Sequence, residues 1–236
     1  MRNYIITILA ALIPLCSTAK ENTVYHAVVK KTRIYNNIPR DQNIEYWFTK
    51  DKTCIVQRGM KTIVRKDLGL VYTYVERSNG YYLDSINVNN ETDKKTDEIN
   101  FRVLGQDRYS PDYEWLMHKE KVVEMLNDFK TTRFTYDGDA DFDEVKLDFW
   151  LTKPKNGEMA ELFNSMQSDY AKNNKTRTPL HNILSENKKL IPVQIIDVRE
   201  NSISPSVINK TLVEKIEEAD PPENIFELPE GAKKLN

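Results

Sequence analysis

Alternating apolar and polar positions dominate the chain from residue 24 to residue 88. Val24, His26 and Val28 alternate with their neighbours at a period of two, which is typical of β-strands. Similar runs, rich in β-branched and aromatic residues, follow at short intervals. The predicted strands are 24–35, 43–49, 52–57, 60–66, 70–77 and 81–88.

The connections between these strands are short, as at Lys50-Asp51 and Arg58-Gly59. Parallel neighbours would need crossovers of about a dozen residues. The strands are therefore predicted to form an antiparallel meander. The segment Ser78-Asn79-Gly80 predicts a hairpin with a type I′ turn, because Asn and Gly tolerate the positive φ angles of that turn.

Helical periodicity is found only in the second half of the chain. Met159, Leu162, Phe163, Met166 and Tyr170 fall on one face of a helix predicted over 158–171. An N-cap signal followed by proline predicts a helix over 111–120, and a similar signal predicts a shorter helix over 179–184.

The remaining segments of the second half are predicted strands, over 129–136, 144–152, 190–198 and 208–216. Residues 122–126 either continue the preceding helix or form a strand that pairs with 129–136. Residues 89–98 are polar without periodicity and are predicted to form an exposed loop.

This order of elements predicts an α+β fold in one domain over residues 20–236. Large antiparallel sheets twist and curl, and the apolar stripe of the 158–171 helix must be buried. We expect a curved antiparallel sheet, or half-barrel, with two or three helices on its concave face. Side chains between sheet and helix either fill that space or leave a pocket, and the sequence leaves both open.

The N-terminus has the features of a secretory signal peptide over residues 1–19. Arg2 is followed by an apolar run too short to span a bilayer, and Ser17 and Ala19 are the small residues that suit cleavage after Ala19. Lipidation at Cys16 and an uncleaved anchor are the alternatives. Periplasmic or secreted localisation follows, with no membrane span in the mature chain.

The charge balance and the cysteine content limit the kinds of partner and cross-link that this chain can have. The chain has 34 Lys and Arg against 36 Asp and Glu, a net charge of -2, so the basic field typical of nucleic-acid binding is absent. Cleavage would remove Cys16 and leave Cys54 without an intramolecular partner. We interpret Cys54, in a strand-like run, as a small buried core residue.

The C-terminal part resembles a known family. Residues 144–155, the helix with Met and Leu, the strand near residue 191 and above all residues 225–231, Ile-Phe-Glu-Leu-Pro-Glu-Gly, carry the likeness. The chain resembles an uncharacterised family of secreted bacterial envelope proteins that end in Phe-Glu-(Ile/Leu)-Pro-x-Gly. That family resembles the half-barrel carriers and receptors of outer-membrane lipoproteins. The resemblance implies a curved sheet around helices, with an apolar cavity for lipid or acyl chains.

Sequence signals for chemistry are weak. The acidic residues of 137–144 favour a hairpin turn over a calcium site, because Phe142 stands where an EF-hand needs Gly. The three histidines, His26, His118 and His181, lack metal-binding spacing, and no Gly-x-Ser-x-Gly elbow is present. We therefore predict no enzyme activity, no cofactor and no metal.

The favoured hypothesis is a non-enzymatic periplasmic binding or carrier protein for an apolar ligand, such as a lipid or the acyl chains of a lipoprotein. The alternative is an envelope interaction or structural module with a filled core. The predicted ligand-lining residues are Met159, Leu162, Phe163 and Met166 of the helix, with Phe149 or Leu147 opposite. The sequence leaves the ligand, the partner and the oligomeric state open.

Overall fold

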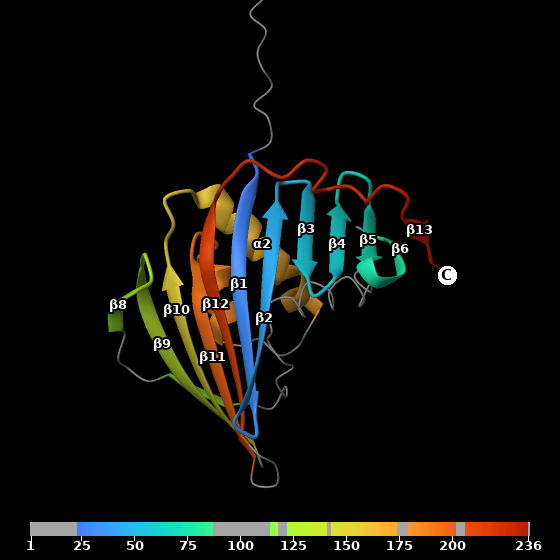
Figure 1. Ribbon diagram of the computed structural model, residues 1–236. Coiled ribbons are helices and arrows are strands. Elements are labelled where there is room, and N and C mark those ends of the chain that lie inside the picture. The colour runs from blue at the N-terminus through green and yellow to red at the C-terminus, as the bar shows by residue number, and fades with distance from the viewer. Residues whose placement is uncertain are drawn as a thin grey trace, which may run out of the picture.

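Strands make up most of the part of the chain that the computed structural model describes, which is residues 23–86, 114–117, 122–140, 143–173, 179–201 and 206–235. They join into one 13-stranded sheet (Figure 1). The strands of the first half are β1 (Tyr25–Tyr35), β2 (Ile38–Phe48), β3 (Lys52–Gln57), β4 (Met60–Arg65), β5 (Leu70–Val75) and β6 (Gly80–Ser85). The later strands are β7 (Glu114–Met117), β8 (Val122–Leu126), β9 (Phe129–Ala140), β10 (Asp143–Thr152), β11 (Ile191–Asn201), β12 (Val207–Glu218) and β13 (Lys233–Lys234).

Among the described residues, two α-helices accompany the sheet, α2 (Gly157–Asn173) and α3 (Pro179–Glu186), with a short 3-10 helix, η1 (Glu76–Ser78). Within the described residues the sheet is open: β13 lies at one edge, and β7 and β8 both pair with β9 at the other. The predicted large antiparallel sheet is confirmed, but with two short helices beside 13 strands the described part of the protein is mostly β, where the sequence predicted an α+β fold. The predicted signal peptide and the predicted loop over 89–98 lie outside the described residues.

The predicted meander of the first half is confirmed, since β2 to β6 pair antiparallel in chain order. The turn between β5 and β6 differs from the prediction. Residues 76–78 form η1, only Asn79 has a positive φ, of 45°, and Gly80 already pairs with Val75. The predicted type I′ turn is wrong here because it needs positive φ at two successive residues. Asn36 and Asn37, between β1 and β2, have that pattern, with φ of 51° and 60°.

The helix predicted over 111–120 is wrong where the structure describes it. Residues 114–117 form β7, which pairs antiparallel with β9. The edge of β9 offers backbone donors and acceptors that a strand satisfies, and this pairing overrides the local helix signal. For residues 122–126 the strand alternative is confirmed, because β8 pairs with the other end of β9.

The two halves of the chain meet where β12 pairs with β1. Their register runs from Tyr25 opposite Glu218 to Tyr35 opposite Val207, with a bulge between Val28 and Val29. Pairing over this sequence distance makes one continuous sheet of the two halves. Buried Pro192 lies at a register shift between β10 and β11, which fits the missing N–H of proline.

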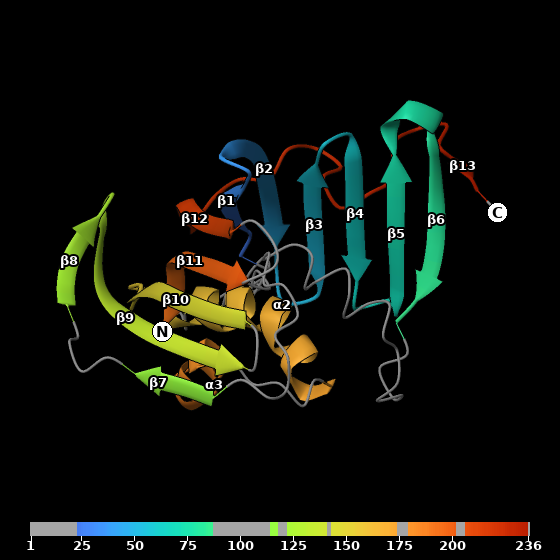
Figure 2. The same cartoon turned by 90° about the horizontal axis from the view of Figure 1, so that it is seen from below.

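Both helices cover one face of the sheet, which we call the inner face (Figure 2). The α2 side chains Met159, Phe163 and Met166 pack on β1 and β2, where Tyr25 lies opposite Phe48. The α3 side chains Leu180 and Leu184 pack on β10 and β11. The two helices predicted over 158–171 and from 179 are confirmed.

The opposite, outer face carries Trp47, Cys54 and Ile63 beneath residues 219–235, which we call the C-terminal strap. Three strap side chains, Ile225, Phe226 and Leu228, pack on this cluster. Lys61 Nζ donates hydrogen bonds to the strap carbonyl oxygens of Asn224 at 3.3 Å and Glu227 at 2.8 Å. Residues 225–231, the most specific part of the family resemblance, thus belong to the segment that covers the outer face.

Beyond the strap carbonyls, β13 pairs in parallel with β6. Gly80 makes room for this end of the strap, since a Cβ there would lie 2.7 Å from Leu235 Cγ. The strap therefore crosses the outer face from the end of β12 to the far edge strand (Figure 1).

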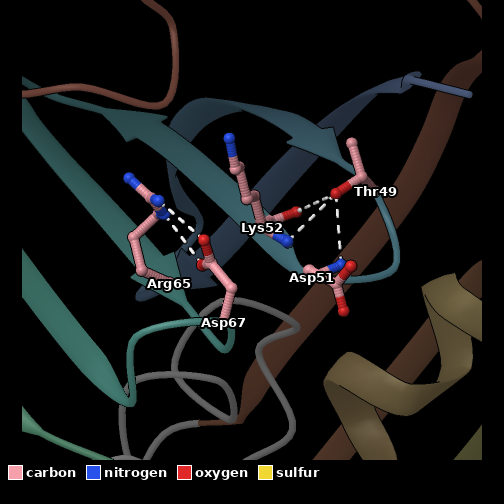
Figure 3. A network of polar contacts seen from close by, with 5 residues as sticks. All are labelled: Thr49, Asp51, Lys52, Arg65 and Asp67. Atoms are coloured by element: carbon pink, nitrogen blue, oxygen red, sulfur yellow. Dashed lines mark hydrogen bonds and ion pairs between the residues drawn. The ribbon is translucent and has the colours of Figure 1, made fainter. Parts of the chain in front are cut away.

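Short polar contacts stabilise the turn between β2 and β3 and the turn between β4 and β5 (Figure 3). Thr49 Oγ1 accepts hydrogen bonds from the backbone N–H of Asp51 at 3.2 Å and of Lys52 at 3.0 Å. Arg65 Nε and Nη2 donate to the Asp67 carboxylate at 2.8 and 2.6 Å. These donations lower the pKa of Asp67. The contacts fix tight connections, as a meander requires.

Candidate functional site

An open pocket of about 680 Å³ lies where β1 begins, β12 ends and β10 leads into α2. These elements meet at the upper edge of the sheet (Figure 1). Its buried lining is mainly apolar, namely Tyr25, Leu151, Met159 and Ile191, and two buried threonines, Thr131 and Thr152, lie beside them. Exposed charged residues form the rim, from the β8–β9 turn, from the loop after β10 and from the end of β12. The pocket is therefore apolar inside and charged at its opening.

Asn156 fixes the start of α2 at this pocket. Its Oδ1 accepts hydrogen bonds from the backbone N–H of Glu158 at 3.0 Å and of Met159 at 3.3 Å, as an N-cap does. Its Nδ2 donates to Tyr25 Oη at 3.0 Å, which ties the helix to the first residue of β1. These bonds place Met159 in the pocket wall.

The hydroxyl of Tyr25 remains a neutral hydrogen-bonding group. Burial raises the pKa of Tyr25, and the Asn156 hydrogen bond offsets only part of that rise. Tyr25 Oη in turn donates to Glu158 Oε2 at 3.5 Å. At neutral pH Tyr25 is therefore uncharged, and it brings no negative charge into the pocket.

A polar network on the outer face fixes the β8–β9 hairpin against β10. Arg133 Nη2 lies 3.0 Å from Asp148 Oδ2, and its guanidinium stands over Trp150 at 4.9 Å. Trp150 Nε1 donates to the carboxylate of Glu124. Thr135 Oγ1 donates to Asp148 Oδ1 at 2.5 Å. The hairpin that forms one wall of the pocket is thus held by β10.

A second amide holds the opposite wall. Asn164 Nδ2, from the middle of α2, donates to the carbonyl oxygens of Lys188 at 2.9 Å and Leu190 at 2.6 Å. This fixes the start of β11, and Leu190 and Ile191 line the pocket from there. The side-chain amides of Asn156 and Asn164 thus position α2, β1 and β11 around the pocket.

The structure distributes the predicted lining residues over three places. Met159 lines the pocket. Leu162, Phe163 and Met166 lie beneath α2, packed on the β1–β2 residues of the inner face. Leu147 and Phe149 lie beneath α3, in a separate cluster with Leu180 and Leu184. The structure therefore brings the four helix residues together and places the two strand residues under the other helix.

Sequence reasoning missed most of the pocket. The residue pattern predicts only a strand at Tyr25 and gives no signal at Lys130, and the resemblance, which includes Lys153, Lys155 and the strand near Ile191, assigns none of them to a binding site. One local signal was present: Lys153-Pro154-Lys155 ends the alternation of β10 with two charges. The approach of β12 to these residues depends on long-range pairing and had no local signal.

The described residues outside the pocket offer little sign of another kind of site. Among the described residues, no three His, Cys, Asp or Glu side chains gather as a metal site would require. Within the same part of the chain, no helix has the length and apolarity needed to cross a membrane. His26 stacks on Trp47 on the outer face, away from the pocket lining.

Comparisons with known proteins give distant structural likenesses only. No protein-family model and no curated protein matches the sequence. The chain is similar to PNGF-II, with a TM-score of 0.35 and 9% identity over 90% of this chain, but it spans only 30% of that longer protein.

Two smaller proteins give similar values. A DUF1329 family protein from Desulfovibrio piger has a TM-score of 0.34 and 8% identity, covering 88% of this chain and 91% of its own. A LolA superfamily protein from Nitrosomonas europaea has a TM-score of 0.31 and 8% identity, covering 87% and 90%. TM-scores this low do not establish a common fold, so the function has to be argued from the residues of this chain.

Proposed function

We propose that this protein is a non-enzymatic binding or carrier protein for an apolar ligand, a lipid or the acyl chain of a lipoprotein, and that the ligand enters the pocket beside Met159. The observation that carries the proposal is an open pocket of about 680 Å³ whose buried lining is mainly apolar. Ligand pockets typically measure about 300–1,000 Å³ and combine apolar walls with few polar groups.

The driving force in this proposal is the transfer of an alkyl chain from water. Each buried methylene contributes about 0.8 kcal/mol, so about ten methylenes gain about 8 kcal/mol before the costs of association are subtracted. The thioether of Met159 adapts its shape to different chains. Val123, exposed on β8, extends the apolar lining outward.

The proposal includes the cellular location and the shape of the domain. Residues 1–19 act as a cleaved signal peptide, and residues 20–236 form a single half-barrel with the helices on its concave face. An exported carrier of this kind needs no cofactor and no metal. The resemblance of residues 225–231 to an envelope family that itself resembles half-barrel lipoprotein carriers supports this proposal.

The test is a titration of the purified protein with the neutral apolar fluorophore N-phenyl-1-naphthylamine, followed by its displacement with 1-dodecanol. We expect saturable binding at one site. Val123→Asp places a charge in the pocket mouth at a 61% exposed position and should weaken binding about tenfold, or about 1.4 kcal/mol. Val122→Asp is the matched control, because its side chain points to the opposite face of β8.

Two results would contradict this proposal: no saturable binding, or equal weakening by both aspartate variants. The alternative, an envelope interaction or structural module with a filled core, would then take its place. Leu116, Met117 and Met125 of β7 and β8, all exposed, would be the first residues to test in that case.

A further inference from the structure

Three lysines gather on one side of the pocket rim. Lys130 comes from β9, and Lys153 and Lys155 come from the loop between β10 and α2. The β9–β10 register ends with Thr132 opposite Leu151, and Lys130 and Lys153 each lie two residues beyond that last pair. The hydrogen bond from Thr152 Oγ1 to the carbonyl oxygen of Lys130, at 2.9 Å, shows that the two strands stay adjacent there.

These lysines make no ion pair with any described residue. The rim also contains Asp128, Glu217 and Glu218, but Glu217 pairs with Lys215 at 2.5 Å. Three rim lysines against the two remaining rim carboxylates, Asp128 and Glu218, therefore leave positive charge available to a ligand.

Apolar surface lies directly beside this positive charge. Val123 lies opposite Thr132, and Met125 lies opposite Lys130, in the β8–β9 register. Alternate residues of a strand share one face, so Met125 follows Val123 on the pocket side of β8, and Met125 is 65% exposed. A ligand that touches Lys130 and Lys153 thus has apolar side chains on both sides, at the mouth and in the interior.

We infer that the ligand of this pocket is an anionic amphiphile: an alkyl chain that lies against Met159 and Leu151, with a carboxylate or phosphate headgroup held by Lys130, Lys153 and Lys155. This inference rests on the proposed function and adds the charge of the ligand to it. A lysine ammonium is a point charge with three donors, and it binds either kind of anion.

The test compares two ligands with the same chain. Dodecanoate and 1-dodecanol are each used to displace N-phenyl-1-naphthylamine, and inorganic phosphate is tested alone. We expect dodecanoate to bind about tenfold more tightly than dodecanol at low ionic strength, with the preference shrinking as salt screens the rim. Phosphate alone should displace neither the fluorophore nor dodecanoate.

The decisive variant is Lys130→Gln with Lys153→Gln. It should reduce the preference for dodecanoate to about twofold or less and leave dodecanol binding unchanged. Lys146→Gln is the matched control, since Lys146 is exposed on β10 but outside the pocket lining, and its preference should equal that of the wild type.

The outcomes separate the two proposals. Equal affinity for dodecanoate and dodecanol overturns the anionic headgroup and leaves the apolar carrier intact. Loss of dodecanol binding in the double glutamine variant also overturns the anionic headgroup, because the lysines would then be needed for the structure of the pocket and not for binding a charge. Phosphate that competes with dodecanoate at similar concentration indicates a free-anion site instead. If neither ligand displaces the fluorophore, the proposed function itself fails.

Discussion

The two faces of the sheet are buried by different means. On the inner face, α2 brings a stripe of side chains onto β1 and β2, and Tyr46, Phe48 and Phe163 are each about 1% exposed. On the outer face, the C-terminal strap covers a smaller cluster, and its side chains Ile225 and Phe226 remain only half-buried. A helix covers a sheet with rows of side chains, whereas a single extended segment covers it with one row.

The pocket lies where the helical cover ends. Helix α2 begins at Gly157, and the pocket lining comes from the segments around that start: the loop after β10, the first residue of β1 and the end of β12. A helix covers a sheet only along its own length, so room for a pocket is left where the helix begins. The contrast between the two faces therefore explains why the apolar pocket occurs on the side covered by helices.

The largest expected effect is on the inner face. Phe163→Ala should lower the free energy of unfolding by about 3–5 kcal/mol, because it leaves a cavity among fully buried aromatic rings. Phe226→Ala, on the half-buried strap, should lower it by about 1–2 kcal/mol. Urea unfolding followed by circular dichroism measures both changes.

Because Phe163→Ala alone can prevent folding, Phe163→Leu provides a milder step at the same position, with an expected loss of about 1–2 kcal/mol. Equal losses for Phe163→Ala and Phe226→Ala would show that the strap contributes as much as α2. The two faces would then contribute equally to the free energy of unfolding, although one is covered by helices and the other by an extended segment.

The second prediction concerns Cys54, which the strap cluster buries. Burial raises the pKa of its thiol to about 11, so the thiolate that reacts with disulfide reagents is scarce at neutral pH. Phe226→Ala combined with Leu228→Ala should increase the rate of reaction with 5,5′-dithiobis(2-nitrobenzoate) about tenfold, by easing local opening of the outer face.

Phe163→Leu is the control for this experiment, because it weakens the other face. If it increases thiol reactivity as much as the strap variant, Cys54 becomes exposed through global unfolding and the strap is not a separate cover. The unfolded chain should titrate one thiol if Cys16 is removed with the signal peptide and two if it is retained. The count therefore also tests the proposed cleavage.

Periodicity predicted most of the elements, because each depends on local alternation. Helix α2 and the β2–β6 meander follow directly from the spacing of apolar residues. The helix predicted over 111–120 failed because its N-cap and proline signals are local, whereas pairing with β9 is not. The strand pair β1–β12 could not be predicted, since no local feature of residues 25–35 specifies a partner near the C-terminus.

The pocket was less predictable than the fold for the same reason. Met159 was identified through its helical stripe, but the stripe itself does not distinguish a residue at an open end from one in a filled core. Phe163, one turn further along α2, is 1% exposed between β-sheet aromatics, whereas Met159 reaches the pocket. That difference depends on where the loop after β10 and the end of β12 lie.

The smallest predicted effect is a pH dependence that arises on the outer face. His26 stacks on Trp47 at 4.0 Å, and no described residue hydrogen-bonds its buried Nε2. Burial lowers the pKa of His26, more than Glu45 at 3.9 Å raises it. The unfolded chain therefore binds the proton more readily. The stabilising effect of the neutral ring is complete above the unfolded pKa of about 6.5, and it is lost as the pH falls from there through the lower pKa of the folded chain.

His26→Phe keeps a ring on Trp47 and removes the titration. The loss of unfolding free energy between pH 7.5 and pH 5.0 should be smaller in this variant than in the wild type, as urea titrations at the two pH values measure. Glu45→Gln is the control, because removing the attractive charge should enlarge the loss. If His26→Phe has the same pH dependence as the wild type, the outer face contributes nothing to it, and carboxylates elsewhere in the sheet carry the effect.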